Sequence, residues 1–193
     1  MTSFLKSALV SIDFINDIVH PSGKLAAKGY PTFIKEHDTF SRLVKVQSLF
    51  RSNGGNLIHV RIGFSPSFCE LSESSPLLGR AKQYQALILG SWGTEFFDIV
   101  QPIPGESVIV KHRISSFYAT NLDLLLRSKQ IDTLYVAGVA TDLAVESTVR
   151  DAHDRDYAVI VLDDCCAAAN ENDHQSALGI MSKIATLSKA DSL

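Results

Sequence analysis

The sequence predicts an α/β fold in which a mostly parallel β-sheet is packed between layers of helices. Short apolar runs alternate with longer segments that have the period of an α-helix, which is the pattern of βαβ units. The 193 residues, 46% of them hydrophobic and 20% charged, are enough to bury such a sheet on both faces. No linker-like stretch and no internal repeat divides the chain, so we expect a single domain over residues 1–193.

The first half of the chain predicts two strands and one long helix. The apolar run at residues 7–14 indicates a strand that ends at Asp13. Residues 33–52 carry apolar side chains at helical spacing, and Asn53-Gly54-Gly55 ends this helix. A second strand is expected at residues 56–64.

A long segment without clear periodicity, residues 65–106, follows the second strand and is rich in Ser, Pro and Gly. Loops of this length inside compact domains are usually functional or contain short helices. We therefore expect one of these two outcomes for this segment.

The second half of the chain predicts further strands that alternate with helices, which brings the total to five or six strands. Strands are expected at 107–111, 133–138, 157–163 and 184–188, and helices at about 119–128, 141–156 and 170–183. Thr141 or Asp142 is expected to cap the helix after the fourth strand, because both side chains can accept from the first free N–H groups of a helix.

Charge and composition exclude several classes of partner. A formal net charge of -3 offers no basic face for phosphates, so we expect no nucleic-acid partner. The first residues do not have the pattern of a signal peptide, and no apolar run approaches the roughly 20 residues that span a bilayer. We therefore expect a cytoplasmic protein without a membrane partner. The three cysteines are expected to be reduced.

Side chains that can carry chemistry stand at the carboxyl ends of three predicted strands. Asp13 ends the first strand, Lys111 ends the third, and a turn at residues 138–144 follows the fourth. Ligands of parallel α/β sheets bind at this edge, because loops and helix N-termini converge there. A carboxylate and an ammonium in apolar surroundings are costly to bury unless they pair. The pair belongs either to a functional site or to a structural salt bridge, and the spacing leaves both readings open.

Four stretches of the sequence together resemble the isochorismatase-like family of cysteine hydrolases, which includes nicotinamidases, other small-amide hydrolases and isochorismatase itself. They are SIDFINDI (11–18), ESVIVKHRISSFYATNLDLLL (106–126), GVATDLAVESTVRDA (138–152), and the DDCCAA segment with the histidine that follows it (163–174). The resemblance covers nearly the whole chain and is weakest over residues 65–106. It implies a doubly wound α/β fold whose six-stranded sheet has the order 3-2-1-4-5-6, with helices on both faces.

The resemblance implies a catalytic triad of aspartate, lysine and cysteine. Asp13 and Lys111 match the first two members, but Ala144 stands where the family carries the cysteine. The resemblance also implies a cis peptide bond between Val139 and Ala140. The backbone N–H groups of Ala140 and Ala144 match the implied oxyanion hole.

A methyl group cannot attack a carbonyl, so this chain is expected to be inactive as a cysteine hydrolase. Either alanine has replaced a native cysteine, or the chain belongs to the branch that lacks the cysteine, as true isochorismatases do. For that branch, the resemblance implies that Asp13 acts as a general acid and protonates a vinyl ether such as isochorismate, after which water adds and pyruvate leaves. Burial raises the pKa of Asp13 and Lys111 lowers it, so their balance decides which chemistry is accessible.

The sequence thus predicts a hydrolase that acts on a small molecule. The alternative is a non-catalytic relative that keeps the pocket and serves as a small-molecule-binding or scaffold protein. The long loop with its aromatic side chains further predicts a homo-oligomer, in which subunits can cover one another's sites.

No metal and no other cofactor is expected. Nicotinamidases of the family carry an Asp-x-His motif after the second strand, where this chain has Arg61-Ile62-Gly63, and the six histidines show no metal-ligand spacing. His59 is either a core histidine or a polar contact to substrate. His174 recurs in the family pattern, although its position in a helix favours a structural role.

Further candidates for substrate binding flank the strand ends or lie in the long loop. They are Phe14, Trp92, Phe117, Tyr118 and Arg61, while His112 and Arg113 could hold a substrate carboxylate. None of the cysteines is expected to act as the nucleophile: Cys69 lies in the long loop, and Cys165 and Cys166 follow the fifth strand, where buried structural cysteines are common.

Overall fold

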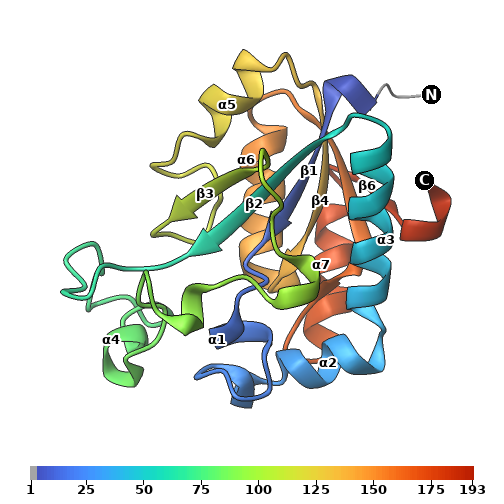
Figure 1. Cartoon of the computed structure of the whole chain (residues 1–193). Helices are drawn as coiled ribbons and strands as arrows, with labels where there is room; N and C mark the ends of the chain where they lie inside the picture. The colour runs from blue at the N-terminus through green and yellow to red at the C-terminus, as the bar shows by residue number, and fades with distance from the viewer. Residues whose placement is uncertain (1–3) are drawn as a thin grey trace.

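The computed structural model describes residues 4–193 as a six-stranded parallel sheet between two layers of helices (Figure 1). The strands are β1 (Ser7–Ile12), β2 (Asn56–Ile62), β3 (Ser107–Lys111), β4 (Thr133–Val139), β5 (Ala158–Ala167) and β6 (Thr186–Ser188). Their order across the sheet is β3-β2-β1-β4-β5-β6, and each neighbouring pair is parallel. The predicted doubly wound α/β fold is therefore confirmed.

Helices cover both faces of the sheet. On one face lie α2 (Tyr30–Glu36) and α3 (Thr39–Ser52), with the short helices α1 (Asn16–Val19) and α4 (Arg80–Tyr84) near the carboxyl ends of the strands. On the other face lie α5 (Leu122–Ser128), α6 (Glu146–His153) and α7 (Glu171–Met181).

The central strand β1 shows why the sheet needs both layers. Every residue of β1 is buried. Leu9 belongs to the apolar cluster that includes Phe50 of α3, whereas Val10 belongs to the opposite cluster with Leu126 of α5. A parallel strand covered on both faces is largely apolar rather than alternating, which explains the nearly continuous apolar run of β1.

The helix predicted over residues 33–52 is in fact two helices, α2 and α3. Asp38 adopts a left-handed backbone conformation with φ 52°, which interrupts the helix. His37 stabilises the end of α2, because its ring stacks on Phe33 and its Nδ1 lies 3.0 Å from Phe33 O. The apolar spacing continues through this break, so periodicity alone did not reveal it.

The loop at residues 65–106 contains short helices, which is one of the two outcomes expected from its length. They are α4 and two single turns, η3 (Trp92–Thr94) and η4 (Asp98–Val100). The prediction for β5 was too short, because this strand continues to Ala167 and includes Cys165 and Cys166, which are both buried. In the part of the chain that the structure describes, no helix is long and apolar enough to cross a membrane.

Candidate functional site

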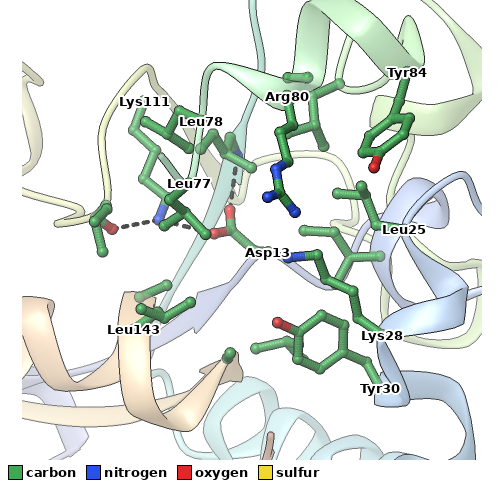
Figure 2. A pocket seen from close by; sticks show the side chains of 18 residues that line it. Asp13, Leu25, Lys28, Tyr30, Leu77, Leu78, Arg80, Tyr84, Lys111 and Leu143 are labelled. Carbon is green, nitrogen blue, oxygen red and sulfur yellow. Dashed lines mark hydrogen bonds and ion pairs between the residues drawn. The ribbon is translucent and has the colours of Figure 1, made fainter. Parts of the chain in front are cut away.

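The site is built around a buried ion pair at the carboxyl edge of the sheet. Asp13 directly follows β1 and Lys111 ends β3, and the end of β2 lies between them. Lys111 Nζ lies 2.8 Å from Asp13 Oδ2 and donates to Ile114 O at 2.6 Å (Figure 2). Asp13 Oδ1 accepts from the backbone N–H of Ile62 at 2.7 Å. Both oxygens of the carboxylate are therefore held in fixed directions.

Asp13 has a backbone conformation that few side chains adopt. Its φ is 59°, in the left-handed region that Asp tolerates better than most residues. Two backbone hydrogen bonds hold this turn: Asp13 N donates to Val60 O at 2.8 Å, and Ile15 N donates to Asp13 O at 2.8 Å. An unusual backbone conformation at a strand end is common where a side chain must be presented to a ligand.

The electrostatics of Asp13 are set mainly by burial. Burial raises the pKa of this carboxyl above its ordinary value, while the Lys111 ammonium and the Ile62 N–H oppose the rise. The desolvation effect is the largest of these, so Asp13 holds a proton more readily than a surface aspartate does. A carboxyl with a raised pKa is a candidate for both accepting and donating a proton in a reaction.

The turn after β4 completes this edge of the site. The Val139–Ala140 peptide bond is cis, as the resemblance implies, and Thr141–Val145 forms a π-helical turn instead of the first turn of an α-helix. Ala140 O accepts from the N–H groups of Leu143 at 3.2 Å and Val145 at 3.1 Å. Ala144, between these two donors, is buried and lines the cavity next to the ion pair.

The residue types around this turn follow from its geometry. At Gly138 an added Cβ would lie 2.7 Å from Ile12 Cβ and 2.9 Å from Ile12 O, so a side chain there would collide with β1. The predicted helix cap is wrong, because Ala140 is the N-cap and no side chain caps the turn. Thr141 Oγ1 instead lies 2.9 Å from His174 Nδ1, and both side chains are buried. This contact gives His174 a structural position behind the turn.

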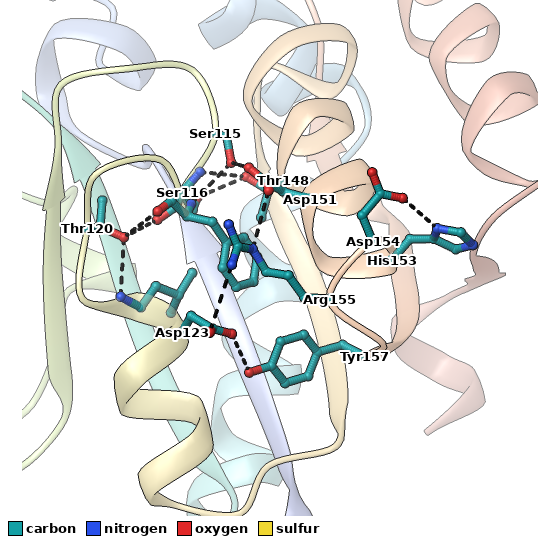
Figure 3. Close-up of polar contacts among 12 residues, drawn as sticks. Ser115, Ser116, Thr120, Asp123, Thr148, Asp151, His153, Asp154, Arg155 and Tyr157 are labelled. Carbon is teal, nitrogen blue, oxygen red and sulfur yellow. Dashed lines mark hydrogen bonds and ion pairs between the residues drawn. The ribbon is translucent and has the colours of Figure 1, made fainter.

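Hydrogen bonds from α6 tie the turn to the segment that follows Lys111 (Figure 3). Thr148 Oγ1 donates to Ala144 O at 2.7 Å and lies 3.0 Å from Ser116 Oγ. The N–H of Ser116 donates to Thr148 Oγ1 at 3.1 Å. Ser115 Oγ donates to Asp151 Oδ2 at 2.6 Å. Residue 144 and the segment after Lys111 are thus fixed to the same helix.

A cavity of about 100 Å³ opens above the ion pair. Its walls are largely apolar and include Leu25, Leu77, Leu78 and Leu143. Asp13, Lys111, Val139, Ala140 and Ala144 all line it, so the structure brings together the residues expected at the three strand ends.

The other predicted substrate-binding residues lie outside this cavity. Phe14 is buried in the core beside Phe40, and Trp92 makes an edge contact with the ring of His20. Arg61 Nη1 donates to Thr94 O at 3.1 Å, with its guanidinium over the Phe96 ring. These three side chains make their contacts with neighbouring residues of the fold and not with the cavity.

Two further aromatic candidates, Phe117 and Tyr118, also lie outside this cavity. Phe117 is packed with the helices of the opposite face and stacks near Tyr157. Tyr118, the next residue, is 61% exposed. The segment after Lys111 turns toward α6, so these rings do not reach the cavity.

The remaining polar candidates have structural partners. His59 Nε2 lies 2.9 Å from Glu106 Oε2, and burial lowers the pKa of this histidine. The ring nitrogen of His112 lies 2.6 Å from Gly63 O, and Arg113 Nη1 donates to Glu70 O at 2.8 Å. Over residues 4–193 the structure brings together no group of three or more His, Cys, Asp or Glu side chains that could hold a metal ion.

One side of the cavity was not predicted from the sequence. This side comes from residues 25–30 and from residues 77–84, which include α4, and its polar members are Lys28, Tyr30, Arg80 and Tyr84. These segments have no helical or strand period that would assign their side chains to a face. The length of the 65–106 loop was the one signal that pointed to part of it.

Comparisons with known proteins agree with this fold. Residues 7–192 match the family model described as the isochorismatase domain. The chain is 34% identical over 185 residues to the ureidoacrylate amidohydrolase RutB of Yersinia enterocolitica, a match that covers 89% of this chain and 79% of that protein. RutB of Methylobacterium radiotolerans is 31% identical over 183 residues, covering 88% and 70% of the two chains.

Solved structures show the same similarity. The N-carbamoylsarcosine amidase of Thermoplasma acidophilum superposes with a TM-score of 0.77 at 31% identity, covering 97% of this chain and 98% of that chain. An isochorismatase family protein of Desulfovibrio vulgaris superposes with a TM-score of 0.87 at 26% identity, covering 97% and 95%.

Proposed function

Because the chain belongs to the isochorismatase family, we propose that its cavity is the site of a small-molecule hydrolase, with an amide of the carbamoyl type as the first candidate substrate. The observation that carries the proposal is the convergence of Asp13, Lys111 and the turn at Ala144 on one cavity. The relatives named ureidoacrylate amidohydrolase and N-carbamoylsarcosine amidase support an amide, since both names describe that chemistry.

The amide reaction requires a nucleophile at residue 144. A thiol there would give its proton to Asp13 and attack the amide carbon, while the N–H groups of Ala140 and residue 144 receive the developing oxyanion. Asp13 would then return the proton to the leaving amine, and water would hydrolyse the thioester. Lys111 would hold the aspartate in place and favour the charged form that accepts the thiol proton. The methyl group of Ala144 supplies no electron pair, so this form binds an amide without completing the thiol route.

A second candidate function needs no residue at position 144. Burial raises the pKa of Asp13, which favours a protonated carboxyl that can donate to the terminal carbon of a vinyl ether such as isochorismate. Water adds to the resulting oxocarbenium ion, and the hemiketal collapses to pyruvate and an alcohol. Lys111, at 2.8 Å, opposes this protonation, which makes it the second choice.

Two product assays separate these functions. N-carbamoyl-β-alanine is supplied to the parent protein and to Ala144→Cys, and ammonia is measured; isochorismate is supplied to the parent, and pyruvate is measured. The amide proposal expects ammonia from Ala144→Cys alone, and the vinyl ether proposal expects pyruvate from the parent. If a folded protein yields neither product but binds one of these compounds, the small-molecule-binding or scaffold alternative is favoured instead.

A further inference from the structure

Two cationic side chains face the cavity on the side away from the β3 strand end. Lys28 ends the single turn η2 (Ala26–Lys28), and Arg80 is the first residue of α4. Figure 2 shows both charged groups directed into the space in front of Asp13, from two segments that are far apart in the sequence. Both side chains are exposed at the mouth, so a ligand that enters can reach them.

Neither of these cations is used by the fold. The structure gives no hydrogen bond and no ion pair to the Lys28 ammonium or the Arg80 guanidinium from any residue between 4 and 193. Neighbouring cations are engaged: the Lys24 ammonium donates to Gln85 O, and Lys82 pairs with Glu73. Long cationic side chains that line a cavity without a protein partner are free to bind an anion.

The cavity as a whole is positive. Its charged lining residues within the described chain are Asp13, Lys28, Arg80 and Lys111, an excess of cations, although the chain as a whole carries a net charge of -3. Asp13 already accepts from Lys111 and from the N–H of Ile62, so its oxygens are not left to neutralise the other two cations. A ligand that brings one negative charge would improve this balance.

The space between the two ends is apolar, and the cavity is small, at about 100 Å³. Leu25, Leu77 and Leu78 form its walls, with Leu143 on the side of the turn. A matching ligand therefore has a polar reacting group at Asp13, a short carbon segment against the leucines, and an anionic group at the mouth. A guanidinium and an ammonium suit a carboxylate, because the guanidinium can donate two parallel hydrogen bonds to it.

We propose that Lys28 and Arg80 form an anion-binding end of the cavity, so that the ligand is a small amide with a carboxylate on the side away from Asp13. This inference rests on the proposed amide function for the choice of reacting group. It predicts that the substrate is negatively charged and that Lys28 and Arg80 select for this charge. Neither residue takes part in the proton transfers.

Binding to the parent protein tests the proposal, because Ala144 prevents turnover by the thiol route. The probes are N-carbamoyl-β-alanine and its carboxamide, which have nearly the same shape and differ in charge. Titration calorimetry at low salt should show the acid binding about tenfold or more tightly than the carboxamide, the effect of one good charge-assisted hydrogen bond. Added salt should narrow the difference.

Single substitutions locate the effect. Lys28→Met and Arg80→Met should each weaken binding of the acid about tenfold and change binding of the carboxamide less than twofold. Lys82→Met is the matched control, because it removes one positive charge from α4, the helix that also carries Arg80. Lys82 does not line the cavity, and its exposed ion pair with Glu73 contributes little to stability. Lys82→Met should therefore bind the acid with the same affinity as the parent.

Three results would overturn the anion site. The parent could bind the acid and the carboxamide with equal affinity, it could show no measurable binding of the acid, or Lys28→Met and Arg80→Met could weaken binding of the two probes equally. Its fate is separable from that of the amide function. Hydrolysis of the carboxamide by Ala144→Cys as fast as that of the acid would remove the anion site and leave the amide function standing. Selective binding of the acid without its hydrolysis by Ala144→Cys would remove the amide function and leave the anion site standing.

Discussion

Lys111 Nζ and Asp13 Oδ2 lie 2.8 Å apart at the base of the cavity, with 1% and 3% of the two residues exposed. Each group is the charge partner that allows the other to be buried. Two charges in such surroundings are maintained at a cost to stability and are rarely needed for the fold alone. This cost supports a functional role for the pair.

Lys111→Met should destabilise the protein at pH 7 by about 3–5 kcal/mol, because it leaves the buried Asp13 carboxylate without its partner. The loss should be smaller at pH 5, since a carboxyl whose pKa is already raised can then take up a proton. Urea unfolding at the two pH values measures both effects. The double variant Asp13→Asn/Lys111→Met should recover much of the stability, and a double variant as unstable as Lys111→Met would contradict this explanation.

Thr148→Val should lower stability by about 1–3 kcal/mol, because it leaves buried hydrogen-bonding groups of Ala144 and Ser116 without a partner. Since Ala144 O is one of these groups, binding of N-carbamoyl-β-alanine should weaken as well. Denaturant unfolding and calorimetry test the two effects. Thr148→Ser keeps the hydroxyl and is the control; if Ser behaves like Val, the hydrogen bonds are not the cause.

His174 predicts a pH dependence of stability below neutral pH. Burial lowers the pKa of this histidine below its ordinary value, so the unfolded chain binds a proton that the folded chain resists. Stability contributed by the neutral ring is therefore present above the unfolded pKa of about 6.5 and is lost as the pH falls below it.

His174→Asn should accordingly make the free energy of unfolding fall less steeply between pH 7.5 and 5.5. Part of the dependence of stability on pH should remain in this variant, because burial also lowers the pKa of His59. His153→Asn replaces a histidine at an exposed position and serves as the control. A His174→Asn slope equal to that of the parent would contradict the assignment.

The native thiols should differ sharply in reactivity. Burial raises the pKa of Cys166 to about 12 and also raises that of Cys165, where Asp164 adds to the effect, whereas Cys69 is exposed. Ellman's reagent should therefore modify one thiol of the native parent and three after unfolding, and Cys69→Ser should abolish the native reaction.

Ala144→Cys should add a second native thiol that iodoacetamide alkylates faster than Cys69, because it lies at a helix start near Lys111. Mass spectrometry of peptides over a time course follows the two sites. Alkylation no faster than at Cys69 would show that the site does not activate a thiol.

The sequence predicted the parts of the site that are set by strand periodicity. Asp13 and Lys111 could be found because polar residues end apolar runs, and parallel strands bring those ends to one edge. The strand order, the cis bond at Val139 and the significance of Ala144 came from the family resemblance and not from local pattern.

The other side of the cavity could not be found in this way. Lys28 and Arg80 lie in segments without periodicity, and only tertiary packing brings them to the same mouth. The break at Asp38 was missed because the apolar spacing runs through it. The expected homo-oligomer stays a prediction, which sedimentation of the purified protein would test.

The release of ammonia from N-carbamoyl-β-alanine by Ala144→Cys tests the central claim most directly, with Ala144→Cys/Asp13→Asn as its matched control. The active site proposed here predicts saturable release by Ala144→Cys, none above background by the parent, and a loss of at least about 100-fold when Asp13 can no longer accept the thiol proton. A folded Ala144→Cys that binds the compound and releases no more ammonia than the parent, or one whose activity Asp13→Asn leaves unchanged, would contradict it.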